Sequence, residues 1–419
     1  MLVIAVFLVF GITSVSAETT AAHVDFQLEV RPILSDNCFQ CHGPDSSTRL
    51  ANLRLDTREG AFTHRDNGVP VVPGDPDASL IMKRLTHEQA ALRMPPAHSR
   101  KSLTEDQIGV IRNWIGQGAD WSGHWAFRAP ESAELPAVKN KSWVHNPVDQ
   151  FILARLEAEG LTPAPEADKR TLARRVALDL TGLPPEPSVV EQFVQDKSPE
   201  AYNNLIEHYL TSEAYGEHRA RYWLDAARYA DTHGIHIDNY RQMWPYRDWV
   251  IKAYNRNLPF DQFTVHQIAG DMLPDPTLDQ LIATGFHRCN VTTNEDGAIP
   301  EEYEAVYAKD RVDTTGTVFL GLTVGCATCH DHKFDPILQK DFYSMAAFFR
   351  NTTQHVMDGN VSDPPPTLVV PSDEDRDQWH QLRAEATELD ALIKKADRSS
   401  QEGFQQWLKT GEYLSITSP

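Results

Sequence analysis

Two copies of the pattern C-x-x-C-H constrain this chain more than any other feature of its sequence. They consist of Cys38, Cys41 and His42 near one end, and of Cys326, Cys329 and His330 farther along. Together they use four of the five cysteines in 419 residues. Chance placement of so few cysteines would almost never produce the pattern twice. The chemistry shared by the two copies therefore dominates what the chain can do.

The spacing within each copy is typical of covalent haem attachment. Cysteines at positions i and i+3 lie on one turn, so both thiols can bond the vinyl groups along one edge of a haem. The histidine that follows is then placed to send a ring nitrogen to the iron. We predict a haem c at the first motif with His42 as iron ligand, and a second haem c with His330 as ligand.

Two other uses of a cysteine pair fit these motifs less well. A thioredoxin-like pair needs a surrounding βαβ pattern, and a zinc site needs two further nitrogen or sulfur ligands at matching spacing. Neither motif has these neighbours, and a disulfide within C-x-x-C closes too short a loop to stabilise a fold. We interpret Cys289, the fifth cysteine, as a buried small side chain rather than a reactive thiol.

A sixth iron ligand for the first haem is expected later in the same region. The segment LRMPPAHS offers Met94, whose loop is stiffened by the two prolines that follow it. A thioether ligand disfavours ferric iron and raises the reduction potential. His98 is the alternative ligand.

The sixth ligand of the second haem is left open by the sequence. His233 and His236 are the main candidates, Met243 and His287 are weaker ones, and an open position is the remaining alternative. His332 lies only two positions after His330, so we expect it beside the haem rather than opposite His330 on the iron.

The N-terminus indicates export. Residues 1–17 are predicted to be a signal peptide, because an apolar run from Leu2 to Ile12 precedes Val15 and Ala17 at the −3 and −1 positions of a cleavage site. The run lacks basic residues before it, and an uncleaved anchor is the alternative. A periplasmic or cell-envelope location agrees with covalent haem attachment, which bacteria carry out outside the cytoplasm.

The charge of the chain limits its partners. A formal net charge of −20 argues against a nucleic-acid partner and favours a basic redox partner protein. An apolar content of 41% provides enough side chains for packed cores.

Helical periodicity dominates the first part of the chain. We predict a compact α domain over residues 24–121, in which Thr104 caps a helix and Gln107 completes a capping box. Residues 122–143 have no clear period and are interpreted as a connector.

The remainder is also predicted to be helical. Residues 144–355 form a larger domain, in which Asn146 and Pro147 start a helix with one apolar face made of Val148, Phe151, Ile152 and Leu156. Residues 372–419 are predicted to form an amphipathic helix, which is the start of a truncated C-terminal region. The predicted fold class is mainly α: a small class I-like cytochrome c domain, a larger predominantly helical domain and a C-terminal amphipathic helix.

Several long motifs resemble a known family. The segment from VRPILSDNCFQCHGP through LRMPP to IRNWIGQGA resembles the planctomycete-type cytochrome c domain. The segment from NPVDQFILARLEAEGL to GCATCHDHKFDPI resembles the domain of unknown function that follows it. The resemblance implies an exported bacterial protein with haem c at the first motif. It also implies that the second C-x-x-C-H motif belongs to the following domain. Members of the family usually continue into a further C-terminal domain.

We therefore expect an exported, di-haem c-type cytochrome that works in extracytoplasmic electron transfer. One alternative is a haem-dependent oxidoreductase or peroxidase-like enzyme with an open second haem, for which His233, His236, Asp238 and Glu295 are candidate acids or bases. The other is a polymer- or partner-binding module in which haem is structural.

Overall fold

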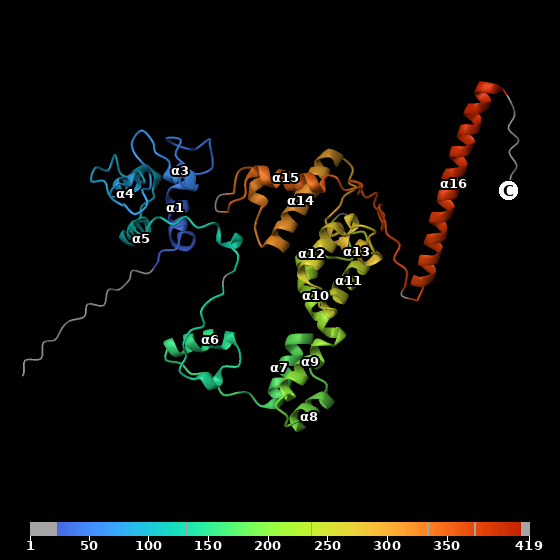
Figure 1. The fold of residues 1–419 in the computed structure, drawn as a ribbon, viewed down its shortest axis with the longest axis horizontal. Helices are drawn as coiled ribbons and strands as arrows, with labels where there is room; N and C mark the ends of the chain where they lie inside the picture. The colour runs from blue at the N-terminus through green and yellow to red at the C-terminus, as the bar shows by residue number, and fades with distance from the viewer. Residues whose placement is uncertain (1–22, 131, 236, 333–334, 373, 412–419) are drawn as a thin grey trace, which may run out of the picture. The chain divides into compact units, whose positions relative to one another are not determined.

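The computed structural model describes residues 23–130, 132–235, 237–332, 335–372 and 374–411 (Figure 1). Within these ranges the chain forms helices joined by loops, and β structure is limited to isolated bridges. The predicted mainly α class is confirmed. The predicted signal peptide and His236 lie outside the described residues.

The chain divides into two compact units. The first comprises residues 1–166 and 321–349, and the second comprises residues 167–320 and 350–419. The second C-x-x-C-H motif thus packs in the same unit as the first, although more than 280 positions separate them along the chain. The domain boundaries expected from the sequence stay a prediction.

The first unit is built from short helices. In chain order they are the π-helical turn η1 (Phe26–Val30), α1 (Arg31–Asn37), α2 (Phe39–His42), α3 (Arg58–Phe62), α4 (Leu80–Leu85), η2 (Ala97–Ser99), α5 (Glu105–Gly116), η3 (Trp125–Phe127), η4 (Lys141–Trp143), α6 (Pro147–Ala158), η7 (Gly325–Thr328) and α15 (Gln339–Phe349).

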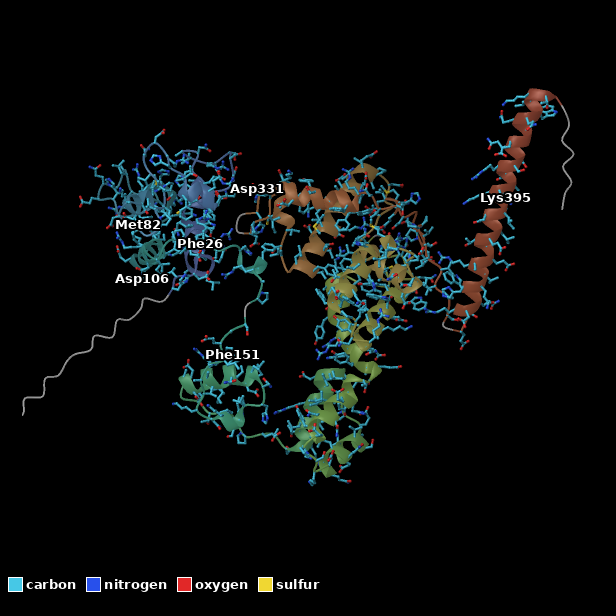
Figure 2. All side chains as sticks on the ribbon, in the orientation of Figure 1. Phe26, Met82, Asp106, Phe151, Asp331 and Lys395 are labelled. Carbon is cyan, nitrogen blue, oxygen red and sulfur yellow. The ribbon has the colours of Figure 1, made fainter. Side chains whose placement is uncertain are left out.

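The core of the first unit gathers around Phe26. Its ring centroid lies 5.3 Å from that of Trp114 and 4.0 Å from that of Trp121, and Met82 is buried in the same cluster (Figure 2). Trp114 comes from α5, whose predicted capping box is present: Thr104 accepts from the Gln107 backbone, and the Gln107 side chain accepts from Thr104. Local capping thus positions the helix that closes this core.

Helix α6 starts where the sequence predicts, but its predicted apolar face is wrong. Asn146 caps it and Pro147 opens it, yet Val148 is 67% exposed and Leu153 is the buried residue. The helix packs on the preceding segment, because Gln150 donates to the Pro136 carbonyl and Glu157 accepts from main-chain amides. Contact with an irregular segment therefore buries a different face of the helix from the one that the periodic pattern predicts.

The second unit holds the longer helices. They are α7 (Lys169–Thr181), α8 (Pro187–Gln195), α9 (Ala201–Leu210), α10 (Glu213–Ala227), α11 (Trp244–Asn255), α12 (Phe260–Ala269), η5 (Gly270–Met272), α13 (Leu278–Ala283), η6 (Thr284–Arg288), α14 (Pro300–Leu320) and α16 (Arg376–Thr410).

The largest cluster of the second unit is aromatic and encloses one buried amide. Gln267 accepts hydrogen bonds from Tyr246 (2.7 Å) and from the indole of Trp223 (2.8 Å). Trp249 and Phe263 stack beside them with centroids 5.3 Å apart. The amide oxygen satisfies two aromatic donors that burial would otherwise leave unpaired.

The predicted C-terminal amphipathic helix is present as α16. Its apolar residues Leu382, Leu389 and Ile393 are all more than half exposed, and it has no buried residue. Across the described ranges, no helix combines the length and the apolar character that crossing a bilayer requires.

Candidate functional site

The first motif forms a single helical turn. The amide of Cys38 donates to the Leu34 carbonyl (2.7 Å), which ends α1, and the amides of Cys41 and His42 both donate to the Cys38 carbonyl (3.1 and 2.8 Å). Cys38 and Cys41 lie one turn apart, as the sequence predicts. The turn presents the donor set that covalent haem attachment needs.

The surroundings of this turn fit a haem. Cys38 packs against the apolar core, and burial raises the pKa of its thiol to about 12. Burial also lowers the pKa of His42, so its ring is neutral at pH 7, as an iron ligand must be. Nδ1 of His42 is buried, with no hydrogen-bond partner among the described residues. Burying a polar nitrogen in this way is unfavourable, and only a partner at Nδ1 itself would offset that cost.

The two sixth-ligand candidates of the first haem lie in the same unit. Met94 follows α4, and its amide donates to the Arg84 carbonyl (3.0 Å), which fixes the main chain of the loop. Its side chain is 38% exposed, whereas His98 sits on η2. Met94 as ligand stays a prediction.

The second motif lies on η7 and is more exposed than the first. The thiols of Cys326 and Cys329 are exposed, while Ala327 between them is buried. Gln339 and Tyr343 of α15 donate to the Thr328 carbonyl at 3.1 and 3.0 Å. Helix α15 therefore supports the turn that carries the two cysteines.

The ring of His330 is oriented by its neighbour. Nδ1 of His330 lies 2.8 Å from the carbonyl oxygen of Asp331. A carbonyl oxygen can only accept, so Nδ1 carries a proton, and in the neutral ring Nε2 keeps its lone pair. This is the tautomer that binds iron through Nε2, and so this motif too fits a haem.

Asp335 organises the loop that follows. Its Oδ1 accepts from Nε2 of His124 (3.0 Å), and its amide donates to Nδ1 of His332 (2.9 Å). His332 thus lies close to the second motif, and its place beside a haem stays a prediction. Sequence reasoning missed His124, which lies in the segment interpreted as a connector. Nothing local in the sequence indicates a contact across 211 positions.

The loop after the second motif lies near the first motif. The hydrogen bond from Arg54 to Asp56 raises the pKa of Arg54 most, and the charge of Asp331 also raises it. Burial lowers the pKa of Arg31, at the start of α1, and the charge of Asp335 partly offsets that effect. Arg54 adjoins Leu55, whose amide donates to the His42 carbonyl (2.8 Å). The carboxylates of Asp331 and Asp335 therefore lie within electrostatic reach of Arg54 and Arg31, which flank the first motif.

Comparison with protein families identifies both parts of the chain. The family described as Planctomycete cytochrome C matches residues 38–98, and a family of unknown function, DUF1549, matches residues 147–354. The chain belongs to the planctomycete cytochrome family with this domain order. The first match spans Cys38 to His98, and the second contains the other C-x-x-C-H motif. No curated protein and no solved structure matches the chain.

In this planctomycete cytochrome, the other predicted iron ligands belong to the second unit. His233 and Met243 line one cavity there. A ring nitrogen of His287 donates to the Ile268 carbonyl (3.1 Å), and burial lowers the pKa of His287 to about 4. Asp238 accepts from the Gly234 amide. These contacts account for His287 and Asp238 by local structure, and ligation by His233 stays a prediction.

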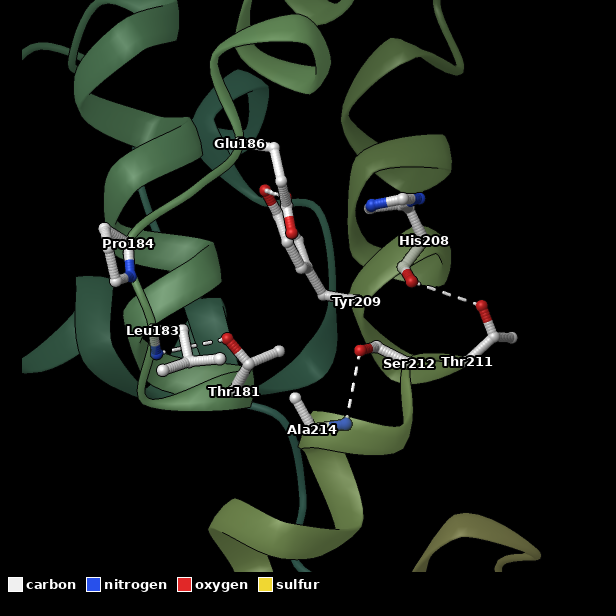
Figure 3. Close-up of a pocket in the computed structure, with 9 residues that line it drawn as sticks. All are labelled: Thr181, Leu183, Pro184, Glu186, His208, Tyr209, Thr211, Ser212 and Ala214. Carbon is white, nitrogen blue, oxygen red and sulfur yellow. Dashed lines mark hydrogen bonds between the residues drawn. The ribbon is translucent and has the colours of Figure 1, made fainter.

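A second cavity of the same unit, of about 320 Å³, is lined by polar groups that serve as helix caps (Figure 3). Thr181 accepts from the Leu183 amide, Ser212 accepts from the Ala214 amide, and Thr211 donates to the His208 carbonyl. The remaining polar contact joins Tyr209 to Glu186 at 3.4 Å, and burial raises the pKa of Tyr209 to about 12. These hydrogen bonds are local and cap the helices around the cavity.

Proposed function

We propose that this planctomycete cytochrome is an exported di-haem protein that transfers electrons outside the cytoplasm. One observation carries the proposal: both C-x-x-C-H motifs lie in one compact unit. Carboxylates of the loop after the second motif are also within electrostatic reach of arginines that flank the first. Electron transfer needs little more than haems near each other and near a surface. Export is supported by the pattern of residues 1–17.

The residues of the first unit have separate roles in this proposal. Cys38 and Cys41 would hold one haem c, and Cys326 and Cys329 the other. A bound haem supplies a one-electron redox couple. Around the first motif the apolar core excludes water, which tunes the potential, whereas the exposed second motif is accessible to a partner. Asp331 holds His330 in the tautomer that binds iron.

The charge of the chain supports a basic redox partner protein. At a net charge of −20, the chain attracts a cationic partner over distances limited by the Debye length, which is about 10 Å at 0.1 M salt. The rate of electron exchange with a basic partner should therefore fall as ionic strength rises.

A count of covalent haem tests the proposal. The mature chain would be expressed in a periplasm competent for haem c maturation. Haem per chain would then be measured by mass under denaturing conditions and by pyridine haemochrome. We expect two haems in the wild type and one in Cys326→Ala/Cys329→Ala. Cys289→Ala is the matched control and should keep two.

The opposite results would separate the parts of the proposal. One haem in the wild type, unchanged by Cys326→Ala/Cys329→Ala, would exclude the second haem and leave a mono-haem cytochrome. Two haems that exchange no electrons with each other or with a basic partner would exclude the electron-transfer role.

A further inference from the structure

A cavity of the second unit is lined by arginines. It measures about 250 Å³, and its wall includes Arg228, Arg241 and Arg288. Asn290, Thr292, Gln354, Thr232 and His233 also line the cavity. No aspartate or glutamate lines it within the described residues. A cavity with three cationic side chains and no lining carboxylate is unexpected in a chain of net charge −20.

The charge of Arg241 is neutralised by Asp358. Arg241 is 8% exposed and donates to Oδ2 of Asp358 (2.7 Å), which also accepts from Thr292 (2.6 Å). Burial alone would raise the pKa of Asp358, but these hydrogen bonds and the charge of Arg241 hold it below its ordinary value. Asp358 therefore stays ionised and fixes Arg241 in the wall.

Arg288 has no such partner. Among the described residues its guanidinium donates only to main-chain carbonyls, that of Pro364 at 2.7 Å and that of Pro366 at 3.5 Å. Burial lowers its pKa, and the nearby charge of Arg241 lowers it further. Carbonyl dipoles orient the guanidinium without cancelling its charge, so Arg288 leaves a positive charge at the cavity.

Two more guanidiniums add to this field. Arg228 pairs with Asp310, but its Nε is buried without a partner among the described residues. Arg311, behind the wall, donates to Gln354 (2.5 Å), Asn290 (3.3 Å) and a main-chain carbonyl rather than to a carboxylate. Among these side chains and the partners named here, four arginines are matched by two aspartates.

We propose that this cavity binds a small organic oxyanion, one that bears a carboxylate, sulfate or phosphate group. Guanidinium forks match these groups in geometry and charge. Roughly eight water molecules would fill 250 Å³, at about 30 Å³ each, which is the size of one acidic sugar or of a similar compact acid. Ala230, Met243 and Val291 line other parts of the cavity and would contact the uncharged body of the ligand.

Calorimetry on the haem-loaded mature chain tests the site. The probes are glucuronate, glucose 6-sulfate and glucose 6-phosphate, with glucose as the neutral comparison. We expect at least one acid to bind with a Kd in the millimolar range or tighter and glucose not to bind. Arg288→Gln should weaken binding at least tenfold. Arg174→Gln, which removes an exposed arginine of α7 in the same unit, should leave binding unchanged.

A second pair of variants tests the site even if Arg288→Gln does not fold. Val291 lines the cavity and is 47% exposed, so it tolerates polar replacement. Val291→Asp should abolish binding by repulsion, and Val291→Asn should retain it. The proposal is overturned if no acid binds, if glucose binds equally well, or if the Asp and Asn variants behave alike. Haem content should stay the same in all variants, which separates this result from the fate of the electron-transfer proposal.

Discussion

Nε2 of His124 lies 3.0 Å from Oδ1 of Asp335, and the two residues are 211 positions apart. The His124 side chain is 7% exposed and that of Asp335 is 23% exposed. This contact ties the segment after α5 to the loop that follows the second C-x-x-C-H motif, within one compact unit.

Loss of this contact should destabilise the first unit. His124→Ala leaves the Asp335 carboxylate partly buried without its donor, and we expect the free energy of unfolding to fall by about 1.5–3 kcal/mol. Guanidinium denaturation followed by far-UV circular dichroism would measure it. His145→Ala removes an exposed histidine of the same unit and should change little. Equal effects of the two variants would show that the contact is not stabilising.

Replacement of Met94 should lower the reduction potential of the first haem. If its thioether binds iron, Met94→Leu removes a ligand that favours ferrous iron. Spectroelectrochemistry would report the shift. Met82→Leu is the matched control, because Met82 is buried in the core of the same unit and should keep the potential. A shift in Met82→Leu or in His98→Ala, with none in Met94→Leu, would reassign the ligand.

The stability of the second unit should depend on pH through His287. Burial lowers the folded-state pKa of His287 to about 4, whereas the unfolded value is near 6.5. The unfolded chain therefore binds a proton first, and this contribution is complete above pH 6.5 and is lost as pH falls toward 4. The full effect is about 3 kcal/mol.

Denaturant midpoints at pH 7 and pH 5 would check this dependence. His287→Asn should flatten it, even if that variant is less stable at both pH values. His208→Asn removes an exposed histidine of α9 and should preserve the slope. An unchanged slope in His287→Asn would assign the dependence to other groups.

Cys289 should be unreactive in the folded protein. Burial raises the pKa of its thiol to about 12, so it is protonated at pH 8, and only the thiolate attacks a disulfide reagent. With both motifs bonded to haem, we expect no thiol to react in the native chain and one to react after unfolding. Cys289→Ala should reduce that count to zero. Three reactive thiols would mean that Cys326 and Cys329 carry no haem.

Features that depend on neighbours in the sequence could be predicted without the structure. The capping boxes of α5 and α6 and the single turns that hold each C-x-x-C-H motif all depend on residues within four positions of one another. The mainly α class followed from the same local periodicity. Hydrogen bonds between neighbours form in any context that leaves the segment helical, and so the pattern alone determines them.

Features that depend on packing between distant segments required the tertiary structure. Leu153 rather than Val148 is buried on α6, because an irregular segment packs there. The His124–Asp335 contact and the cavity around Arg241 and Arg288 join segments that no local pattern links. The sequence by itself determined the helical class, the capped starts of α5 and α6 and the spacing of the two cysteine motifs. Only the tertiary structure decided which of those pieces meet, because burial of side chains is a property of long-range contacts rather than of spacing.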